Sequence, residues 1–236
     1  MSRSRSHTNS LFHCLSGAYA LSSPGGPNRL GDVLHRLMYR VVALGGGRIQ
    51  ARLLRRMFDL HHREPDRWSY ETSSYERERF AAVLRGIGPG PYERVLEVGC
   101  SEGVFTRALA SDDRVGAVTA ADVSLRALET ARRRCEGLSN VSFVSGSVVN
   151  EAPPGPFDLI ICSEMLYYVG GRRAAVAREL AKRLAPGGIL VLEHVHPESG
   201  RLHASFIHSA GLEVLERTVV RHSIRPFEVL ALRRPA

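Results

Sequence analysis

An acidic residue and two glycines follow a short apolar run, and this combination suits the binding of a nucleotide-like molecule. Glu97 lies near the end of the run, and Gly99 and Gly103 follow it four residues apart. Because glycine has no Cβ, it adopts unusual backbone angles and lets a ligand approach the backbone closely. Open α/β sheets bind ligands at such turns, beyond the carboxyl ends of parallel strands. We therefore expect a cofactor site here, with Cys100 and Ser101 between the glycines.

The spacing of this turn excludes two well-known phosphate sites. The dinucleotide fingerprint has the spacing G-x-G-x-x-G, and the P-loop requires a lysine after its last glycine. Here three residues separate the glycines, and Val104 follows the second one. The carboxylate of Glu97 would also repel a phosphate, so the turn favours a ligand that carries positive charge.

A second apolar segment, residues 115–122, ends in a carboxylate. Asp122 closes this segment, and Val123 and Ser124 follow it. A carboxylate after the second strand of such a fold can accept hydrogen bonds from both ribose hydroxyls. The alternative is that Asp122 only caps the helix that begins after Ser124. We favour the ribose interpretation and include Val123 in the same site.

Two later segments complete the predicted sheet next to the site. An apolar run at 157–163 follows a proline-rich loop, which is typical of a strand buried on both faces. Polar side chains stand at its carboxyl end, namely Ser163, Glu164 and Tyr167. Residues 184–188 read L-A-P-G-G, which predicts a helix end and a turn before another strand at 189–192.

These segments resemble, in order, the motifs of the class I S-adenosylmethionine-dependent methyltransferases, which here fall at residues 94–106, 115–122, 157–168 and 184–192. The Gly-Cys-Ser turn, residues 66–77 and the run at 162–168 more closely resemble the nodulation-factor N-methyltransferase (NodS-like) branch of that superfamily. This likeness covers roughly residues 57–235. Members of the branch methylate the free amine of an N-deacetylated chitooligosaccharide, and similar enzymes act on other sugars and amines.

The resemblance implies both a fold and a cofactor. The fold is α/β with three layers, in which a doubly wound, mostly parallel sheet of seven strands has the Rossmann-like order 3-2-1-4-5-7-6 and strand 7 is antiparallel. A helical lid precedes the sheet, and S-adenosyl-L-methionine is the cofactor. Its implied contacts include the first turn, Asp122 and Ser163.

Two positions depart from the superfamily pattern. Ser101 replaces the middle glycine of the first turn, and Gly146-Ser147 stands where an Asp would bind the adenine amino group. Ser147 can still donate or accept one hydrogen bond, so we keep it as a cofactor residue. Adenine recognition thus has the fewest matching residues in the predicted site.

The segment before the first strand is rich in aromatic residues. Ser73 and Glu76 have the spacing of a capping box for a helix that extends to Arg85. Trp68 and Tyr75 are the aromatic residues that we expect to lie over the cofactor as part of the lid. An aromatic face attracts a sulfonium by about 0.5–2 kcal/mol. The alternative is that these rings only fill the top of the core.

Glu164 is the first candidate for catalysis, because its carboxylate can bind an ammonium or accept its proton. His194 is the second candidate, since it follows the fifth strand and can reach the same crevice, and Tyr167 is a shaping or hydrogen-bonding group. Glu164 could instead only cap the next helix. No third ligand is evident beside His194 and His196, so we expect no metal site.

The distribution of charge divides the chain and argues against a nucleic-acid partner. Residues 1–56 contain nine arginines and one acidic residue, which together account for the whole formal charge of +8. Residues 57–236 therefore have no net charge, and a domain without a positive field lacks the usual signature of phosphate-backbone binding. We predict a basic extension at 1–56 and a methyltransferase domain at 57–236, with lid helices at 57–90 and the core at 91–236.

Composition and hydropathy complete the expectations. The four cysteines show no metal-binding spacing and are expected to be reduced thiols of a cytoplasmic protein. No segment is apolar enough to cross a membrane. We expect a monomer or a homodimer. Residues 1–29 have a disorder-like composition, and helices are expected at 31–44 and 49–60. The leading function is N-methylation of an amino sugar or related amine. The alternatives are natural-product O-methylation and, with less support, methylation of nucleic acid.

Overall fold

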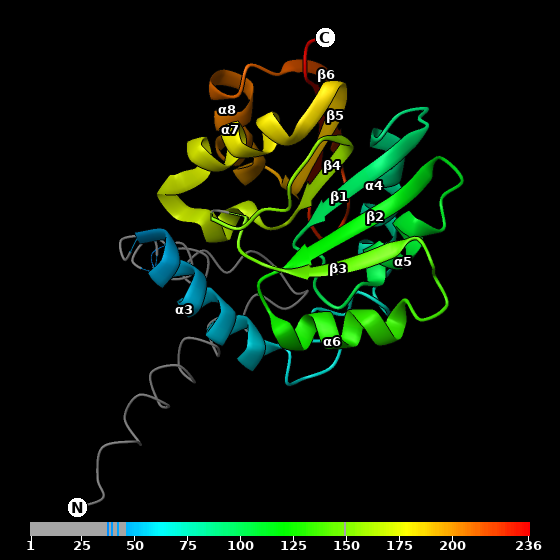
Figure 1. The fold of residues 1–236 in the computed structure, drawn as a ribbon, viewed down its shortest axis with the longest axis vertical. Helices are drawn as coiled ribbons and strands as arrows, with labels where there is room; N and C mark the ends of the chain where they lie inside the picture. Colours follow the sequence, from blue (N-terminus) through cyan, green and yellow to red (C-terminus); the bar gives the residue numbers. More distant parts are fainter. Residues whose placement is uncertain (1–36, 38, 40–41, 43–45, 149) are drawn as a thin grey trace, which may run out of the picture.

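The computed structural model describes residues 46–148 and 150–236, together with residues 37, 39 and 42 (Figure 1). The expected disorder of residues 1–29 and most of the expected helix at 31–44 lie outside the described residues. No helix in the described ranges is long and apolar enough to cross a membrane. The helix expected at 49–60 is present as α3 (Gly46–His61).

The described strands form one sheet of seven, in the order β3-β2-β1-β4-β5-β7-β6. Strands β1 to β5 are parallel, and β7 runs antiparallel to both β5 and β6. The predicted strand order is therefore confirmed. The strands are β1 (Tyr92–Val98), β2 (Val115–Asp122), β3 (Val141–Ser145), β4 (Phe157–Ser163), β5 (Leu184–Val195), β6 (Glu213–Val220) and β7 (Phe227–Arg233).

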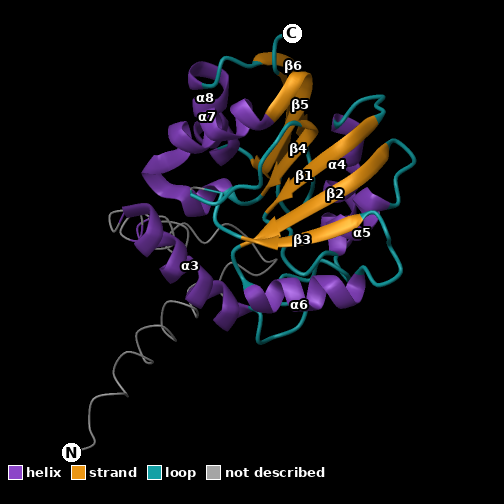
Figure 2. Cartoon of the chain, viewed as in Figure 1, coloured by secondary structure: helices purple, strands orange, loops and turns teal. Residues whose placement is uncertain are grey.

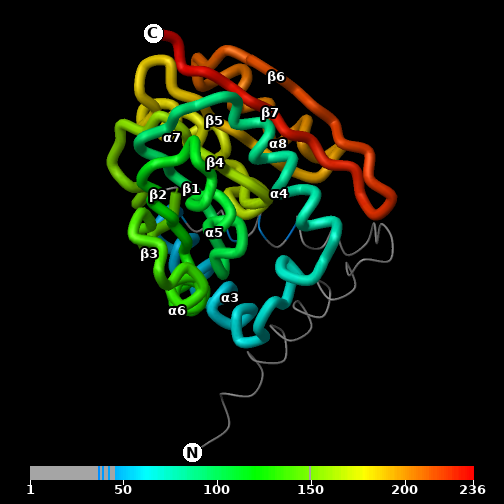
Figure 3. The backbone as a smooth tube through the Cα atoms, turned by 90° about the vertical axis from the view of Figure 1, so that its right-hand side faces the viewer, coloured from blue at the N-terminus to red at the C-terminus, as the bar shows by residue number. Residues whose placement is uncertain are grey.

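Helices cover both faces of the sheet, because the central strands are apolar on both sides. Along β5, Leu190 and Leu192 pack into one cluster with the helices α7 and α8. Val191, between them, points into the other cluster with α4, α5 and α6. Figure 2 shows this three-layer arrangement, and Figure 3 shows β3 and β6 at opposite edges of the sheet. The helices that form these layers are α4 (Ser74–Gly86), α5 (Val104–Ala110), α6 (Leu125–Arg134), α7 (Arg173–Arg183) and α8 (Glu198–Ser209).

The helix α3 lies at the carboxyl ends of the strands rather than on either face of the sheet (Figure 1). Leu54 and Met57 of α3 are buried, and Phe58 packs with them against Val123 and Tyr168. The predicted boundary between residues 56 and 57 falls inside this helix. The division at this point is therefore corrected, because one continuous apolar face of α3 packs across it.

Two local predictions also differ from the structure. Ser73 precedes α4, but its side chain makes no capping hydrogen bond. The reciprocal bond is absent because the Ser73 amide donates to the Ser69 carbonyl and the Glu76 carboxylate pairs with Arg79. Val83 of α4 lies in the core against the sheet, and the lid role expected for residues 57–90 stays a prediction. β5 begins at Leu184 rather than at 189, because its L-A-P-G-G turn is drawn into the sheet by hydrogen bonds with Arg234.

Gly103 provides a test of how the first turn packs against the neighbouring helix. It has a φ of +78°, and a Cβ there would lie 2.9 Å from the Cβ of Ala131 in α6. Gly137 has a φ of +90° with nothing within 4 Å of its Cβ position, so it serves as the matched control. We expect Gly137→Ala to lower the free energy of unfolding by about 1–2 kcal/mol. Gly103→Ala should cost about 1–3 kcal/mol more because of overpacking. Urea unfolding measures both, and equal losses would contradict this packing.

Candidate active site

The glycine turn after β1 forms a cradle of exposed backbone. Gly99 and Ser101 have φ values of +81° and +50°, and the Gly99 and Cys100 amides donate to the carbonyl of Ala121. The Cys100 thiol is buried in the core, so only its backbone borders the turn. The Ser101 hydroxyl is buried without a hydrogen-bond partner among the described residues. A strained serine with an unpaired hydroxyl beside a bare glycine fits a polar ligand.

Asp122 holds this cradle in place from the end of β2. One carboxylate oxygen accepts from the Ser101 amide at 2.9 Å, and the other accepts from the Ser124 amide at 2.8 Å. Each carboxylate oxygen can accept a second hydrogen bond. Asp122 therefore does accept from the Ser124 amide before α6, as the capping alternative requires. Its two carboxylate oxygens can still accept hydrogen bonds from two ribose hydroxyls. Ser124 itself caps α6 through a hydrogen bond from the Ala127 amide.

Glu97 lies beneath the same turn and is almost fully buried. Thr106 donates a hydrogen bond of 2.6 Å to its carboxylate. Burial raises the pKa of Glu97 to about 7, and the nearby Asp122 carboxylate also raises it, while the bond from Thr106 lowers it. The carboxyl group is therefore poised to ionise near neutral pH, where a cationic ligand would favour its charged form.

Glu102 is a residue of the first turn that the sequence analysis did not select. It is 2% exposed, and its carboxylate contacts the His62 ring at 3.0 Å and accepts from the Asp66 amide at 3.2 Å. These contacts tie the segment between α3 and α4 to the turn. Its position between two glycines of the turn could have marked Glu102 as a site residue. Its partner His62 could not be identified, because it lies 40 residues away in the sequence.

The helix α3 brings charged side chains to the adenine side of the predicted site. Arg55 donates to the carbonyl of Val123 at 3.1 Å and to the hydroxyl of Ser145 at 3.3 Å. Asp59 accepts a hydrogen bond of 2.7 Å from the Ser124 hydroxyl. Ser147 is buried at the head of a turn, where its carbonyl accepts from the Asn150 and Glu151 amides. Val123 and Ser147 thus remain near the end of β3, with Arg55 as an additional candidate.

The predicted aromatic residues fall into two separate groups. Trp68 stacks on Tyr70 with ring centroids 6.0 Å apart and lies 4.9 Å from the ring of His62. Tyr75 is buried elsewhere, against Phe227 at 5.9 Å. The structure therefore places Trp68 near the segment that Glu102 holds and places Tyr75 in the core. The hydroxyl of Tyr75 is buried without a partner among the described residues.

At the end of β4, Glu164 occupies a strained position that the end of β5 stabilises. It has a φ of +51°, its amide donates to the Glu193 carbonyl, and its carboxylate accepts from the Val195 amide at 2.9 Å. Tyr167 donates to the same carboxylate oxygen at 3.1 Å. Burial raises the pKa of Glu164, and the Arg79 guanidinium opposes this effect. A non-glycine residue in the left-handed region is typical of functional sites.

A buried ion cluster, which no sequence motif predicted, lies next to Glu164. Arg79 of α4 donates to the Glu193 carboxylate at 2.7 Å and to Glu76 at 2.9 Å. Ser163 donates to the same oxygen of Glu193 at 2.6 Å. Glu193 is fully buried, and its other carboxylate oxygen has no hydrogen-bond partner in the described part of the chain. Burial raises the pKa of Glu193 to about 8; Arg79 opposes the shift, and Glu164 adds to it.

His194 does not reach a crevice as the sequence analysis expected. Its ring is 0% exposed, its Nε2 accepts from the Leu166 amide at 3.1 Å, and its Nδ1 lies 3.0 Å from His203. Both ring nitrogens are engaged, because helix α8 covers this face of β5. His194 therefore has a structural position rather than access to a substrate. The described residues contain no group of metal-ligating side chains.

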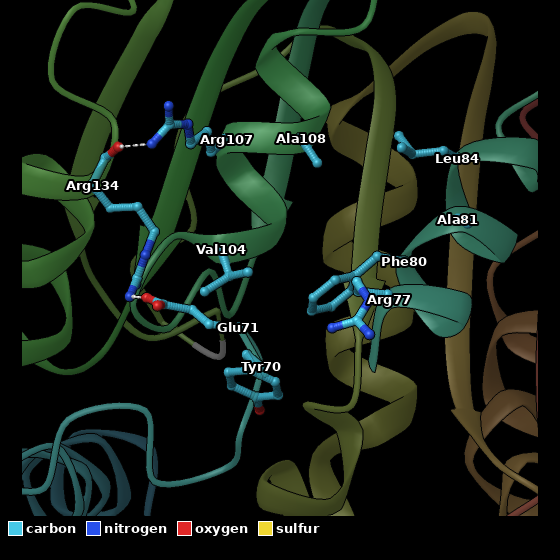
Figure 4. Close-up of a pocket in the computed structure, with 10 residues that line it drawn as sticks. All are labelled: Tyr70, Glu71, Arg77, Phe80, Ala81, Leu84, Val104, Arg107, Ala108 and Arg134. Carbon is cyan, nitrogen blue, oxygen red and sulfur yellow. Dashed lines mark hydrogen bonds and ion pairs between the residues drawn. The ribbon is translucent and has the colours of Figure 1, made fainter. Parts of the chain in front are cut away.

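A groove of about 520 Å³ between α4 and α5 is distinct from this site. Figure 4 shows Phe80 and Leu84 facing Val104 and Ala108 across it, with arginines at its rim. None of the predicted site residues line the groove. The candidate site is therefore the edge formed by the carboxyl ends of β1, β2, β4 and β5.

Comparison with known proteins matches this arrangement to one family. The family model described as nodulation protein S (NodS) matches residues 49–228. This chain belongs to the NodS family. Nodulation protein S of Rhizobium tropici is 38% identical over 130 residues, which are 53% of each chain. The homologue of Sinorhizobium fredii is 36% identical over 57% of this chain and 64% of its own length. The chain thus aligns with between half and two thirds of these relatives.

The crystal structure of N-methyltransferase NodS from Bradyrhizobium japonicum WM9 shares the fold of this chain. It superimposes with a TM-score of 0.69 at 25% identity, covering 77% of this chain and 98% of the other. That structure is a complex with S-adenosyl-L-homocysteine. The Rossmann-like methyltransferase fold expected from the motifs is therefore confirmed.

The raised pKa of Glu97 predicts how affinity for S-adenosylhomocysteine depends on pH. A carboxyl group with a pKa of about 7 is mostly neutral at pH 6 and mostly ionised at pH 8. We expect the affinity for this ammonium-bearing ligand to rise about tenfold between pH 6 and pH 8, because the ionised form binds the cation. Calorimetric titration at each pH measures the change. Glu97→Gln is the matched control and should show no such rise; a flat wild-type profile would contradict the role of Glu97.

Proposed function

We propose that this chain is an S-adenosylmethionine-dependent small-molecule methyltransferase that methylates an amine, such as that of an amino sugar. The single observation that carries the amine assignment is the excess of negative charge at the ends of β4 and β5. Three carboxylates, Glu76, Glu164 and Glu193, surround one guanidinium, that of Arg79. A site with this imbalance favours a cationic group over a neutral hydroxyl.

The cofactor half of the proposal is supported by the turn after β1. Ser101 provides an unpaired buried hydroxyl, and Gly99 and Asp122 provide bare backbone and free acceptor capacity. We assign the ribose to Asp122, the adenine side to Val123, Ser147 and Arg55, and the cationic end to Glu97. When bound, S-adenosylmethionine supplies an activated methyl group on a sulfonium.

The chemistry required of the protein is then to bind and deprotonate the acceptor. An ammonium cannot attack, because its nitrogen has no free electron pair. The raised pKa values of Glu164 and Glu193 mean that the pair can hold a proton near neutral pH. In its ionised form Glu164 accepts a proton from the bound ammonium, which leaves a neutral amine as the nucleophile. General-base assistance of this kind contributes about 10²–10⁴-fold.

Tyr167 and Ser163 position the carboxylates for this step. The Tyr167 hydroxyl donates to Glu164, and it accepts from the Val195 amide at 3.1 Å. Ser163 donates to Glu193. Because both donor side chains are partly buried, and Tyr167 is itself held by the Val195 amide, the carboxylates keep their orientation while the proton moves. Burial raises the pKa of Tyr75, and the charge of Glu164 adds to this shift.

Methyl transfer to matched acceptors tests the assignment. We expect transfer of a tritiated methyl group from S-adenosylmethionine to glucosamine oligomers and aminocyclitols, with the product methylated on nitrogen by mass spectrometry. The N-acetylated oligomers, which have the same hydroxyls and no free amine, are the control. Labelling of the acetylated sugars or of phenols, with none on the amines, would contradict the proposal and favour O-methylation.

Glu164→Gln separates the acceptor role from cofactor binding. The substitution keeps the shape of the side chain and removes the base, so we expect kcat to fall at least tenfold. The dissociation constant of S-adenosylhomocysteine should stay unchanged, because Glu164 lies at the acceptor end. Glu136→Gln, an exposed change after α6, is the control for charge. A kcat for Glu164→Gln equal to that of the wild-type protein would rule out the role.

A further inference from the structure

A continuous chain of hydrogen bonds runs from the surface of the sheet to the loop that carries Glu164. Arg217 of β6 donates twice to the Glu228 carboxylate, with both distances at 3.0 Å. Glu228 accepts from His203 Nδ1 at 3.0 Å, and His203 Nε2 lies 3.0 Å from His194 Nδ1. His194 Nε2 then accepts from the Leu166 amide at 3.1 Å. The mechanism proposed above uses none of these side chains.

The fold brings these residues together from three strands and one helix. His194 and Glu228 are direct partners in the antiparallel pairing of β5 with β7, so their side chains share one face. His203 of α8 fits between them. Ser199, four residues earlier on the same helix, faces the same way and donates to Glu228 at 2.9 Å. Apart from Arg217, which is about half exposed, every member is fully buried.

The backbone amide of Leu166 at one end and the Glu228 carboxylate at the other impose the same proton order along the chain. An amide N–H can only donate, so Nε2 of His194 must accept and its proton must lie on Nδ1. That proton is donated to Nε2 of His203, whose own proton therefore lies on Nδ1 and is donated to Glu228. Hydrogen bonds from His203, Arg217 and Ser199 outweigh the effect of burial and lower the pKa of Glu228 to about 2. Glu228 is therefore ionised at neutral pH and can only accept hydrogen bonds at its end of the chain. Burial also lowers the pKa of His194, which keeps its ring neutral.

The amide that His194 accepts from lies two residues after Glu164. Leu166 begins the short 3-10 helix Leu166–Arg172, and Glu164 before it is held at a φ of +51°. The end of β5 fixes this loop at two further points, through the Glu193 carbonyl and the Val195 amide. If the His194 proton lay on Nε2 instead, this N–H would face the Leu166 N–H. The hydrogen bond that holds the loop at Leu166, its third attachment to β5, would then be lost.

We propose that His194 and His203 are positioning residues that hold the Glu164 loop through the Leu166 amide, with Glu228 fixing their tautomers. This inference rests on the proposed role of Glu164. It accounts for the burial of three polar side chains, His194, His203 and Glu228, to which the proposed mechanism gives no other role. His194 thus acts through the loop and not on the acceptor.

The proton positions can be measured on the protein alone, without any acceptor. Long-range ¹H–¹⁵N correlation on ¹⁵N-histidine-labelled protein distinguishes the two neutral tautomers and the imidazolium. At pH 7 we expect both His194 and His203 to be neutral with the proton on Nδ1. A proton on Nε2 of His194, or a charged ring at either position, would overturn the proposal whatever the activity of the enzyme.

Two substitutions at His194 test positioning against simple packing. Gln can replace Nε2 as the acceptor for Leu166, whereas Leu fills the same volume and accepts nothing. We expect His194→Gln to retain kcat within about threefold and His194→Leu to lower it at least tenfold. Both should bind S-adenosylhomocysteine like the wild-type protein, and His208→Leu, an exposed change on α8, should leave kcat unchanged.

A kcat for His194→Leu equal to that of the wild-type protein would overturn the positioning role. If His194→Leu does not fold, Glu228→Gln takes its place, because a Gln side chain can donate to His203 Nδ1 as well as accept from it, so the end of the chain no longer fixes the proton order. Its kcat should fall at least tenfold with altered histidine tautomers, and an unchanged kcat would likewise overturn the proposal. If the wild-type protein methylates none of the acceptors tested, the proposed function is refuted instead. The tautomer measurement needs no acceptor and would still decide the proton order.

Discussion

The acceptor end of this protein depends on one buried guanidinium. Arg79 of α4 is 3% exposed, and it joins Glu76 on its own helix to Glu193 at the end of β5. A buried carboxylate without a partner is strongly destabilising, and Arg79 is the cation that Glu193 contacts when it is ionised. One guanidinium does not balance three carboxylates, and the remaining negative charge makes this edge of the sheet suitable for a cation.

The same strand end connects this cluster to the geometry of the loop. Glu193, His194 and Val195 are consecutive, and each contacts the β4 loop, through a carbonyl, a ring nitrogen and an amide respectively. The cofactor turn is held separately, by Asp122 from β2 and by Glu102 from within the turn. Two independent sets of buried polar contacts therefore define two parts of this edge of the sheet, which meet where Gly99 lies against Met165.

The sequence was sufficient for what short motifs determine and insufficient for what long-range contacts determine. The turn around Gly99 followed from its local pattern, and the strand order followed from the resemblance of the short motifs to a known superfamily. Arg79 could not be placed, because Glu193 lies 114 residues away. A signal existed: Glu193 and Glu228 are charged residues inside apolar runs, and buried charges require partners. For His194, the alternation of side chains along the strand indicated a face of the sheet. It did not indicate that α8 covers this face and buries the ring.

The central claim is that Glu164 and Glu193 form a carboxyl pair that holds a proton near neutral pH and exchanges it for an acceptor ammonium. Carbon-13 NMR titration of glutamate-labelled protein, with Glu164→Gln and Glu193→Gln for assignment, measures this directly. The account predicts that one carboxyl of the pair stays protonated at pH 7 and titrates near 8, as burial of Glu193 requires. Ionisation of both groups below pH 5 would contradict it.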